Sequence, residues 1–176
     1  RFGKEGFLRF LSHHDLMRVF HRALRRAKLP VRLSGGFNPR PRVVFPHALA
    51  VGISSKDEVV EIELDAWVPP AEFARSLSRE LPRELLMNEV SLLPPRRKGP
   101  AAVEAIYQVG IGGAALDAAR EGASRLLEAS EWTVERKRPD GSTREIDLRP
   151  HVLDLTLEDS RLIMRLRLGK PGAARP

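Results

Sequence analysis

A segment rich in proline, glycine and basic residues, at positions 94–100, constrains the fold more than any other feature of the sequence. It contains three prolines and one glycine, residues that interrupt both helices and strands. We therefore predict a linker at 94–100 between two subdomains, one over residues 1–95 and one over residues 101–176. Each half has the size of a small domain.

The first half has the pattern of an α+β fold. Ser12 and Asp15 have the spacing of a capping box, at the start of a helix that ends before Pro30. Apolar residues alternate with glutamates toward the middle of this half, as in a half-buried strand. The predicted elements are a strand at 7–11, the helix, strands at 42–49 and 58–64, a helix at 70–81 and a strand at 85–93. This β-α-β-β-α-β order predicts a ferredoxin-like sandwich.

The second half predicts a partly similar α+β arrangement with long antiparallel hairpins. Leucines alternate with polar residues on both sides of the turn residues 158–160. The predicted elements are a strand at 105–111, a helix at 114–129, strands at 132–138 and 143–148, and the two arms of this last hairpin.

Basic residues are concentrated at the start of the chain. Residues 1–42 contain 11 Lys or Arg residues and 2 Asp or Glu residues, a formal charge of +9, whereas residues 43–176 carry a charge of −2. Charge confined to one segment indicates a polyanionic partner. We predict that this partner is RNA, either tRNA or rRNA.

The composition excludes several classes of site and location. The chain has no cysteine, so it holds no disulfide, cysteinyl zinc site or cysteine-ligated iron–sulfur cluster of its own. No run of about 18 apolar residues is present, and we predict no membrane span. The N-terminus has no apolar signal core, so we expect a cytoplasmic protein. The missing initiator Met leads us to expect a piece of a longer chain.

The first predicted helix carries its arginines on one side. Arg18, Arg22 and Arg25 fall on a stripe opposite the apolar face, and Arg26 flanks the stripe. A solvated helix face normally mixes charges of both signs, and here Asp15 is the only acid. The stripe could therefore contact a polyanion or form an ordinary solvated face. The missing counter-charges favour contact with a polyanion. Arginine also suits bidentate binding of phosphate.

The loop at 34–42 contains the second group of candidate binding residues. Gly36 and its neighbouring glycine allow backbone amides to turn toward an anion. Phe37 offers a stacking face for a base, and Arg40 and Arg42 add positive charge. The alternative is a loop that only shapes a turn and buries Phe37.

We also predict that the loop and the start of the helix meet in one ligand site. In this hypothesis Ser12, His13 and Asp15 lie near Asn38 and Arg42, because a helix N-terminus, an anion-binding loop and an arginine bind the same kind of group. The alternative is two separate features, each of which stabilises its own local structure.

Other patterns in the sequence give weaker evidence for a catalytic or binding site. Ser12, His13 and Asp15 are too close in sequence to form a serine-hydrolase triad, whose side chains converge from separate segments. A metal site at His13 or at its neighbour His14 would need further ligands, and we predict none. The glycine-rich residues 110–115 fit a dinucleotide-binding pattern loosely, because hairpins and not a parallel βαβ unit follow them. Basic residues around a predicted turn at 139–141 suit either phosphate contact or an exposed hairpin tip.

Two motifs resemble those of a known family. They are residues 12–18, Ser-His-His-Asp-Leu-Met-Arg, and residues 34–42, Ser-Gly-Gly-Phe-Asn-Pro-Arg-Pro-Arg. The chain resembles, over nearly its whole length, a bacterial domain that is fused to cobalamin-binding radical SAM proteins or encoded beside them. Residues 147–150, Asp-Leu-Arg-Pro, also fit. In the typical motifs His14 is Leu, Gly35 is Gln and Arg40 is His, so this chain lacks any role that depends on that Gln or His.

The resemblance implies a role beside a radical SAM partner. The iron–sulfur cluster, SAM and cobalamin are then expected on the partner, with no cofactor in this chain. Our leading hypothesis is a non-catalytic module that binds RNA or presents an RNA substrate for modification. One alternative is an RNA-modifying enzyme with a scaffold like that of pseudouridine synthases, with Asp15 as its candidate catalytic residue; this is an analogy of fold. The other is a protein-interaction domain whose basic helix docks on an acidic partner.

Overall fold

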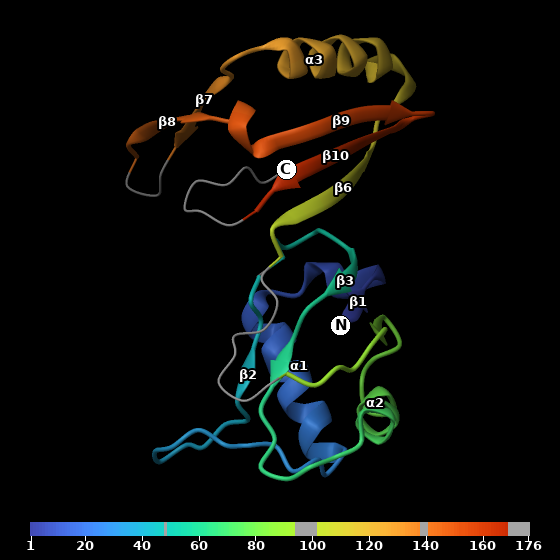
Figure 1. The fold of residues 1–176 in the computed structure, drawn as a ribbon, viewed down its shortest axis with the longest axis vertical. Coiled ribbons are helices and arrows are strands. Elements are labelled where there is room, and N and C mark those ends of the chain that lie inside the picture. The colour runs from blue at the N-terminus through green and yellow to red at the C-terminus, as the bar shows by residue number, and fades with distance from the viewer. Residues whose placement is uncertain (48, 94–101, 138–140, 169–176) are drawn as a thin grey trace. The chain divides into compact units, whose positions relative to one another are not determined.

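The fold was analysed in a computed structural model, which describes residues 1–47, 49–93, 102–137 and 141–168. The chain divides into two compact units, Arg1–Pro100 and Ala101–Pro176. Both units combine helices with antiparallel strands, as Figure 1 shows. The predicted α+β class is therefore confirmed, and the predicted linker at 94–100 lies outside the described residues.

The first unit consists of short strands and two α-helices. Its elements are β1 (Phe2–Lys4), the 3-10 helix η1 (Gly6–Phe10), α1 (His13–Arg26), β2 (Val43–Val44), β3 (Ser55–Glu58), β4 (Glu61–Ile62), α2 (Pro70–Ser78) and β5 (Leu85–Met87). β1 lies between β3 and β5 and is antiparallel to both, and β2 pairs with β4. Of the strand predicted at 58–64, only Glu61–Ile62 forms a strand, β4, and Glu58 is the last residue of β3. The ferredoxin-like assignment stays a prediction.

The strand predicted at 7–11 is wrong. The first strand ends at Lys4, and residues 6–10 form η1. Gly6 has a φ of +57°, a left-handed conformation that glycine adopts without steric cost, and it ends the extended run. Phe7 is 85% exposed. An apolar run in the sequence cannot distinguish exposed aromatic residues from a buried strand.

The predicted helix start is confirmed. The backbone N–H of Asp15 donates a hydrogen bond to Ser12 Oγ at 3.2 Å, so Ser12 is the N-cap of α1. The apolar face of α1 buries Phe20 and Leu24 completely against a core that also includes Phe2. Burial of a side chain of this size contributes about 1.5–3 kcal/mol, so the core holds α1 in a fixed rotation with its arginines outward.

The second unit is built on a three-stranded sheet. Its elements are β6 (Glu104–Gly110), the 3-10 helix η2 (Gly113–Ala115), α3 (Leu116–Glu128), β7 (Thr133–Lys137), β8 (Thr143–Asp147), the 3-10 helix η3 (Arg149–His151), β9 (Val152–Glu158) and β10 (Arg161–Arg167). β10 lies between β6 and β9 and is antiparallel to both, and β7 pairs with β8. The predicted hairpins are confirmed. The antiparallel neighbour of β6 also rules out a parallel dinucleotide-binding unit at residues 110–115.

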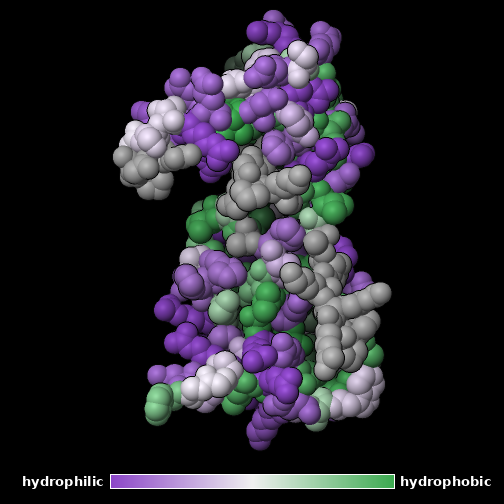
Figure 2. Space-filling model, turned by 60° about the vertical axis from the view of Figure 1, so that its left-hand side comes forward, coloured by the Kyte–Doolittle hydropathy of each residue, from purple (hydrophilic) through white to green (hydrophobic). Residues whose placement is uncertain are grey.

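The surface carries hydrophobic as well as hydrophilic side chains. Figure 2 shows green hydrophobic residues among purple hydrophilic ones on the visible face. Large exposed apolar residues in the first unit include Phe7, Phe37 and Trp67. Within the described ranges, none of the helices has the length and apolar character needed to cross a membrane.

Candidate nucleic-acid interface

The exposed arginines of α1 and the loop at 34–42 come together in one open pocket. Its volume is about 250 Å³, and the residues that line it are all basic: Arg18, His21, Arg22, Arg25 and Arg40. We call it the arginine pocket. Four residues come from α1 at positions that share one face of the helix, and Arg40 comes from the loop. The arginines give the pocket its positive charge, and none of the described residues that line it is acidic.

The loop is held in position by its own hydrogen bonds. The backbone N–H of Ser34 donates to the carbonyl of Arg40 at 2.8 Å, and the N–H of Arg40 donates to Ser34 Oγ at 3.1 Å. These bonds close the base of the loop, which projects as a narrow light-blue hairpin in Figure 1. Gly36 has a φ of +101°, a conformation that favours glycine.

Phe37 lies at the exposed end of this loop. Its side chain is fully accessible to solvent, so the alternative that the loop buries Phe37 is wrong. Asn38 and Arg40 are also exposed. The loop therefore presents an aromatic ring and a guanidinium group on the same short segment, a combination that stacks on bases and contacts phosphates.

His21 is the least exposed group of the arginine pocket. Its Nε2 atom is buried and has no hydrogen-bond partner among the residues the structure describes. Burial lowers the pKa of the imidazole below its usual 6.5, and the charges of Arg25 and Arg40 lower it further, while the carbonyl of Pro41 acts in the opposite direction. At neutral pH the ring is therefore mostly uncharged.

Two of the predicted nucleic-acid-binding arginines have partners within the protein. Arg26 donates to the side chain of Glu80 at 2.7 Å, and Arg42 lies 3.3 Å from the carboxylate of Glu63. By contrast, the side chains of Arg22 and Arg25 have no ion pair or hydrogen bond within the described part of the chain. Two arginines in the middle of α1 are thus without a described ion-pair partner.

Asp15 is fully engaged at the start of α1. Ser12 Oγ donates to its carboxylate at 2.7 Å, and Arg18 donates to it at 3.1 Å. The hydrogen bond from Ser12 lowers the pKa of Asp15 below its usual 3.8, and the charge of Arg18 adds to this effect. A carboxylate that is ionised and hydrogen-bonded in this way is a poor proton donor at neutral pH.

The structure places His13 and the loop in different surroundings. The loop meets α1 at the arginine pocket, and His21 lies two turns, about 12 Å, along the helix from His13. His13 packs against Phe45 with a ring separation of 5.5 Å. Arg18 connects the two regions, because it pairs with Asp15 and also lines the arginine pocket. The predicted shared site of His13 and Asp15 with Asn38 and Arg42 stays a prediction.

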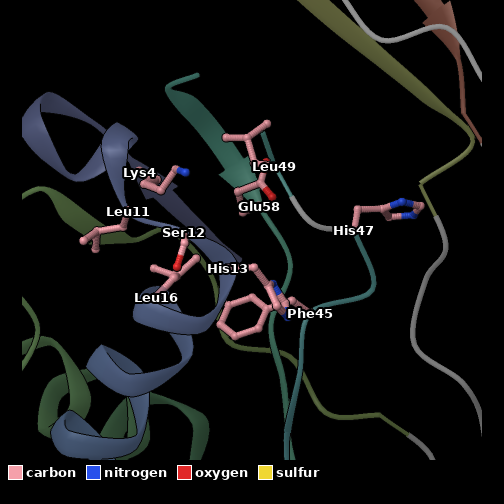
Figure 3. A pocket seen from close by; sticks show the side chains of 9 residues that line it. All are labelled: Lys4, Leu11, Ser12, His13, Leu16, Phe45, His47, Leu49 and Glu58. Atoms are coloured by element: carbon pink, nitrogen blue, oxygen red, sulfur yellow. The ribbon is translucent and has the colours of Figure 1, made fainter. Parts of the chain in front are cut away.

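A second, smaller pocket lies at the start of α1. Figure 3 shows the nine residues that line it: Lys4, Leu11, Ser12, His13, Leu16, Phe45, His47, Leu49 and Glu58. We call it the lysine pocket. The sequence did not point to Lys4 or Glu58. A charged residue with charged neighbours in the sequence gives no sign that its side chain is buried.

The motif at residues 147–150 has a structural role. Arg149 donates three hydrogen bonds, each 3.0 Å long, to the carbonyls of Leu127, Ala129 and Val152. Asp147 accepts from the backbone N–H groups of Trp132 and Arg149. These contacts tie the C-terminal end of α3 to the adjoining strands, where a cation also complements the helix dipole.

The hairpin of β7 and β8 carries like charges opposite each other. Arg136 pairs with Arg144 across the two strands, and Glu135 pairs with Glu145. Like charges in directly opposed positions are destabilising. The turn predicted at 139–141 falls largely outside the described residues.

Among the described residues, no three His, Asp or Glu side chains are grouped closely enough to hold a metal ion.

Comparison with known proteins identifies the family. The model of a family described as "Uncharacterized protein conserved in bacteria (DUF2344)" matches residues 1–176. The chain belongs to this family. No curated protein and no solved structure matches it. The family description covers both units and states no activity.

Proposed function

We propose that the first unit binds RNA through the phosphate groups of its backbone, at the arginine pocket. The observation that carries this proposal is the convergence of five basic side chains, from α1 and from the loop at 34–42, on one pocket without an acidic lining residue. Arginine donors in a fork geometry match phosphate oxygens. The exposed ring of Phe37 adds a surface on which an unpaired base can stack.

We propose further that the chain is a non-catalytic module that presents RNA to a radical SAM partner. The two N-terminal motifs support this through their resemblance to domains linked to such proteins. The hydrogen bonds that Asp15 accepts from Ser12 and Arg18 keep it ionised, so in the alternative of an RNA-modifying enzyme it would not serve as a proton donor. The iron–sulfur cluster, SAM and cobalamin belong to the partner in this proposal.

The test is RNA binding by a variant with three altered arginines. Arg18→Gln/Arg22→Gln/Arg25→Gln removes three charges from the pocket without touching the apolar face of α1. We expect affinity for a fluorescently labelled tRNA to fall by roughly 100-fold, and the log–log salt slope to decrease by about three, one for each lost phosphate contact. Fluorescence anisotropy at several salt concentrations measures both quantities.

A matched control removes the same charge elsewhere in the unit. Arg75, Arg79 and Arg83 are exposed residues on or just after α2, and their replacement by Gln should leave most of the affinity intact. Equal losses in both triple variants would show that only net charge matters and would contradict the pocket. Absence of salt-sensitive RNA binding by the unaltered chain would instead favour the protein-interaction alternative.

A further inference from the structure

Phe37 is an aromatic residue that contributes nothing to the core of its own unit. Four of the seven phenylalanines of the chain are buried in that core, whereas the side chain of Phe37 is fully exposed. Within the described part of the chain, no aromatic ring or guanidinium group packs against it. Single exposed apolar residues are common on protein surfaces. The role of this one therefore depends on how the loop holds it and on what lies beside it.

The backbone of the loop holds the ring away from the body of the unit. Two hydrogen bonds between Ser34 and Arg40 close the loop, and a third, from the N–H of Arg42 to the carbonyl of Arg32 at 2.8 Å, extends this pairing. Apart from its chain neighbours, no described atom lies within 4 Å of a Cβ placed on Gly36. The turn thus projects into open space, as Figure 1 shows. A loop that is fixed in this way loses little conformational entropy when a ligand binds.

The ring lies near the arginine pocket, because Arg40 lines that pocket and follows Phe37 by three residues. Three residues of chain span at most about 11 Å. The pocket volume of about 250 Å³ is smaller than the roughly 300–1,000 Å³ of sites that enclose a drug-sized ligand. A phosphodiester group is smaller than such a ligand, and its charge is complementary to the arginines. The base of a nucleotide bound there would lie outside the pocket, on the side where the loop presents the ring.

We propose that this site binds an unpaired nucleotide of RNA, with a phosphate in the arginine pocket and a base stacked on Phe37, in preference to an RNA duplex. This inference rests on the proposed function and names its class of RNA. Bases in a duplex are stacked on one another, so their faces are not available. Bases in loops and single strands can be splayed out and stacked on an aromatic ring.

The test compares two labelled RNAs with equal numbers of phosphates, an unstructured single strand and a blunt-ended duplex. Fluorescence anisotropy measures the binding of each to the full chain. A site governed by charge alone should bind the duplex at least as tightly, because the charge density of a duplex is higher. We expect the single strand to bind about tenfold more tightly instead, and Phe37→Leu to remove most of this preference. Because the ring is fully exposed, this variant should keep the melting temperature of the unaltered chain.

Two further variants separate base stacking from the loss of an apolar group. Phe37→Trp keeps an aromatic face and should retain the preference for the single strand. In a background of Trp67→Phe and Trp132→Phe, the emission of the introduced indole should be quenched when the single strand binds, because the indole then stacks on a base. Phe7→Leu removes a ring that is 85% exposed on η1, outside the loop, and should leave both affinities unchanged.

Three results would overturn this inference and leave phosphate binding at the arginine pocket in place. They are a duplex bound as tightly as the single strand, an affinity for the single strand unaltered by Phe37→Leu, and an indole that is not quenched in the bound state. In each case affinity would still fall in the triple arginine variant. The second result would point to a protein partner for the ring. If neither RNA shows salt-sensitive binding, the proposed function fails, and this inference fails with it.

Discussion

Two arginine sites, one in each unit of this protein, use the guanidinium group in opposite ways. In the second unit the guanidinium of Arg149 donates hydrogen bonds from all three of its nitrogens, to backbone carbonyls at the end of α3 and the start of β9. In the first unit Arg22 and Arg25 are exposed and bind no other described residue through their side chains. An arginine that donates to several backbone carbonyls stabilises the fold, whereas one without acceptors is available to a ligand. The number of acceptors around each guanidinium, and not its charge, separates the two tasks.

The largest effect on stability should follow from removal of the Arg149 guanidinium. Arg149→Met keeps the aliphatic stem and removes the three donors, so three carbonyls of the second unit lose their partner. We expect a loss of about 3 kcal/mol in the free energy of unfolding of this unit. The two tryptophans, Trp67 and Trp132, lie in different units. Urea unfolding followed by fluorescence in a Trp67→Phe background therefore reports on the second unit.

The control for this variant is an exposed arginine of the same unit. Arg120 lies on the surface of α3, and within the described part of the chain its side chain has one long ionic contact, of 3.8 Å with Asp117. Arg120→Met should change the free energy of unfolding by less than about 0.5 kcal/mol. A loss at Arg149 no larger than this would remove the contrast between the two units.

A smaller effect is expected at the start of α1, where the first unit also uses polar residues structurally. Ser12→Ala removes the N-cap and should lower the free energy of unfolding by about 1 kcal/mol. Fluorescence of Trp67 in a Trp132→Phe background measures it, with Ser78→Ala at the far end of α2 as control.

Because the pKa of Asp15 is lowered in the fold, its stabilising effect is present at neutral pH and is lost as the pH falls through that value. The effect of Ser12→Ala should therefore diminish below about pH 4.

The smallest effect concerns the protonation of His21. Its pKa is lowered in the free protein, and a phosphate in the arginine pocket would favour the charged ring. RNA binding should then take up a proton, and affinity should rise about threefold between roughly pH 7.5 and pH 6. His21→Gln should abolish this rise, whereas the exposed His14→Gln should retain it. A rise that persists in His21→Gln would exclude His21 as the group that accepts the proton.

Local patterns in the sequence predicted the α-helices and the strands of the second unit, whereas β1 and β3 of the first unit were missed. The spacing of Ser12 and Asp15 and the recurrence of Leu16, Phe20 and Leu24 predicted α1 correctly, because caps and helical periodicity depend on neighbours in sequence. The hairpin of β9 and β10 was predicted from its alternation for the same reason. The strand at 7–11 was wrong because solvent exposure of Phe7 is not a local property.

Tertiary structure alone decided how the charged residues are used. Positions 22, 26 and 149 are all arginines in the sequence. Among the described residues, Arg22 has no side-chain partner, Arg26 pairs with Glu80 and Arg149 binds three carbonyls. The arginine pocket exists because the loop returns to the middle of α1, and the lysine pocket exists because β1 buries Lys4 beside Glu58. The sequence determined which charges are present. Burial and the acceptors within reach, which depend on segments distant in the chain, decided their chemistry.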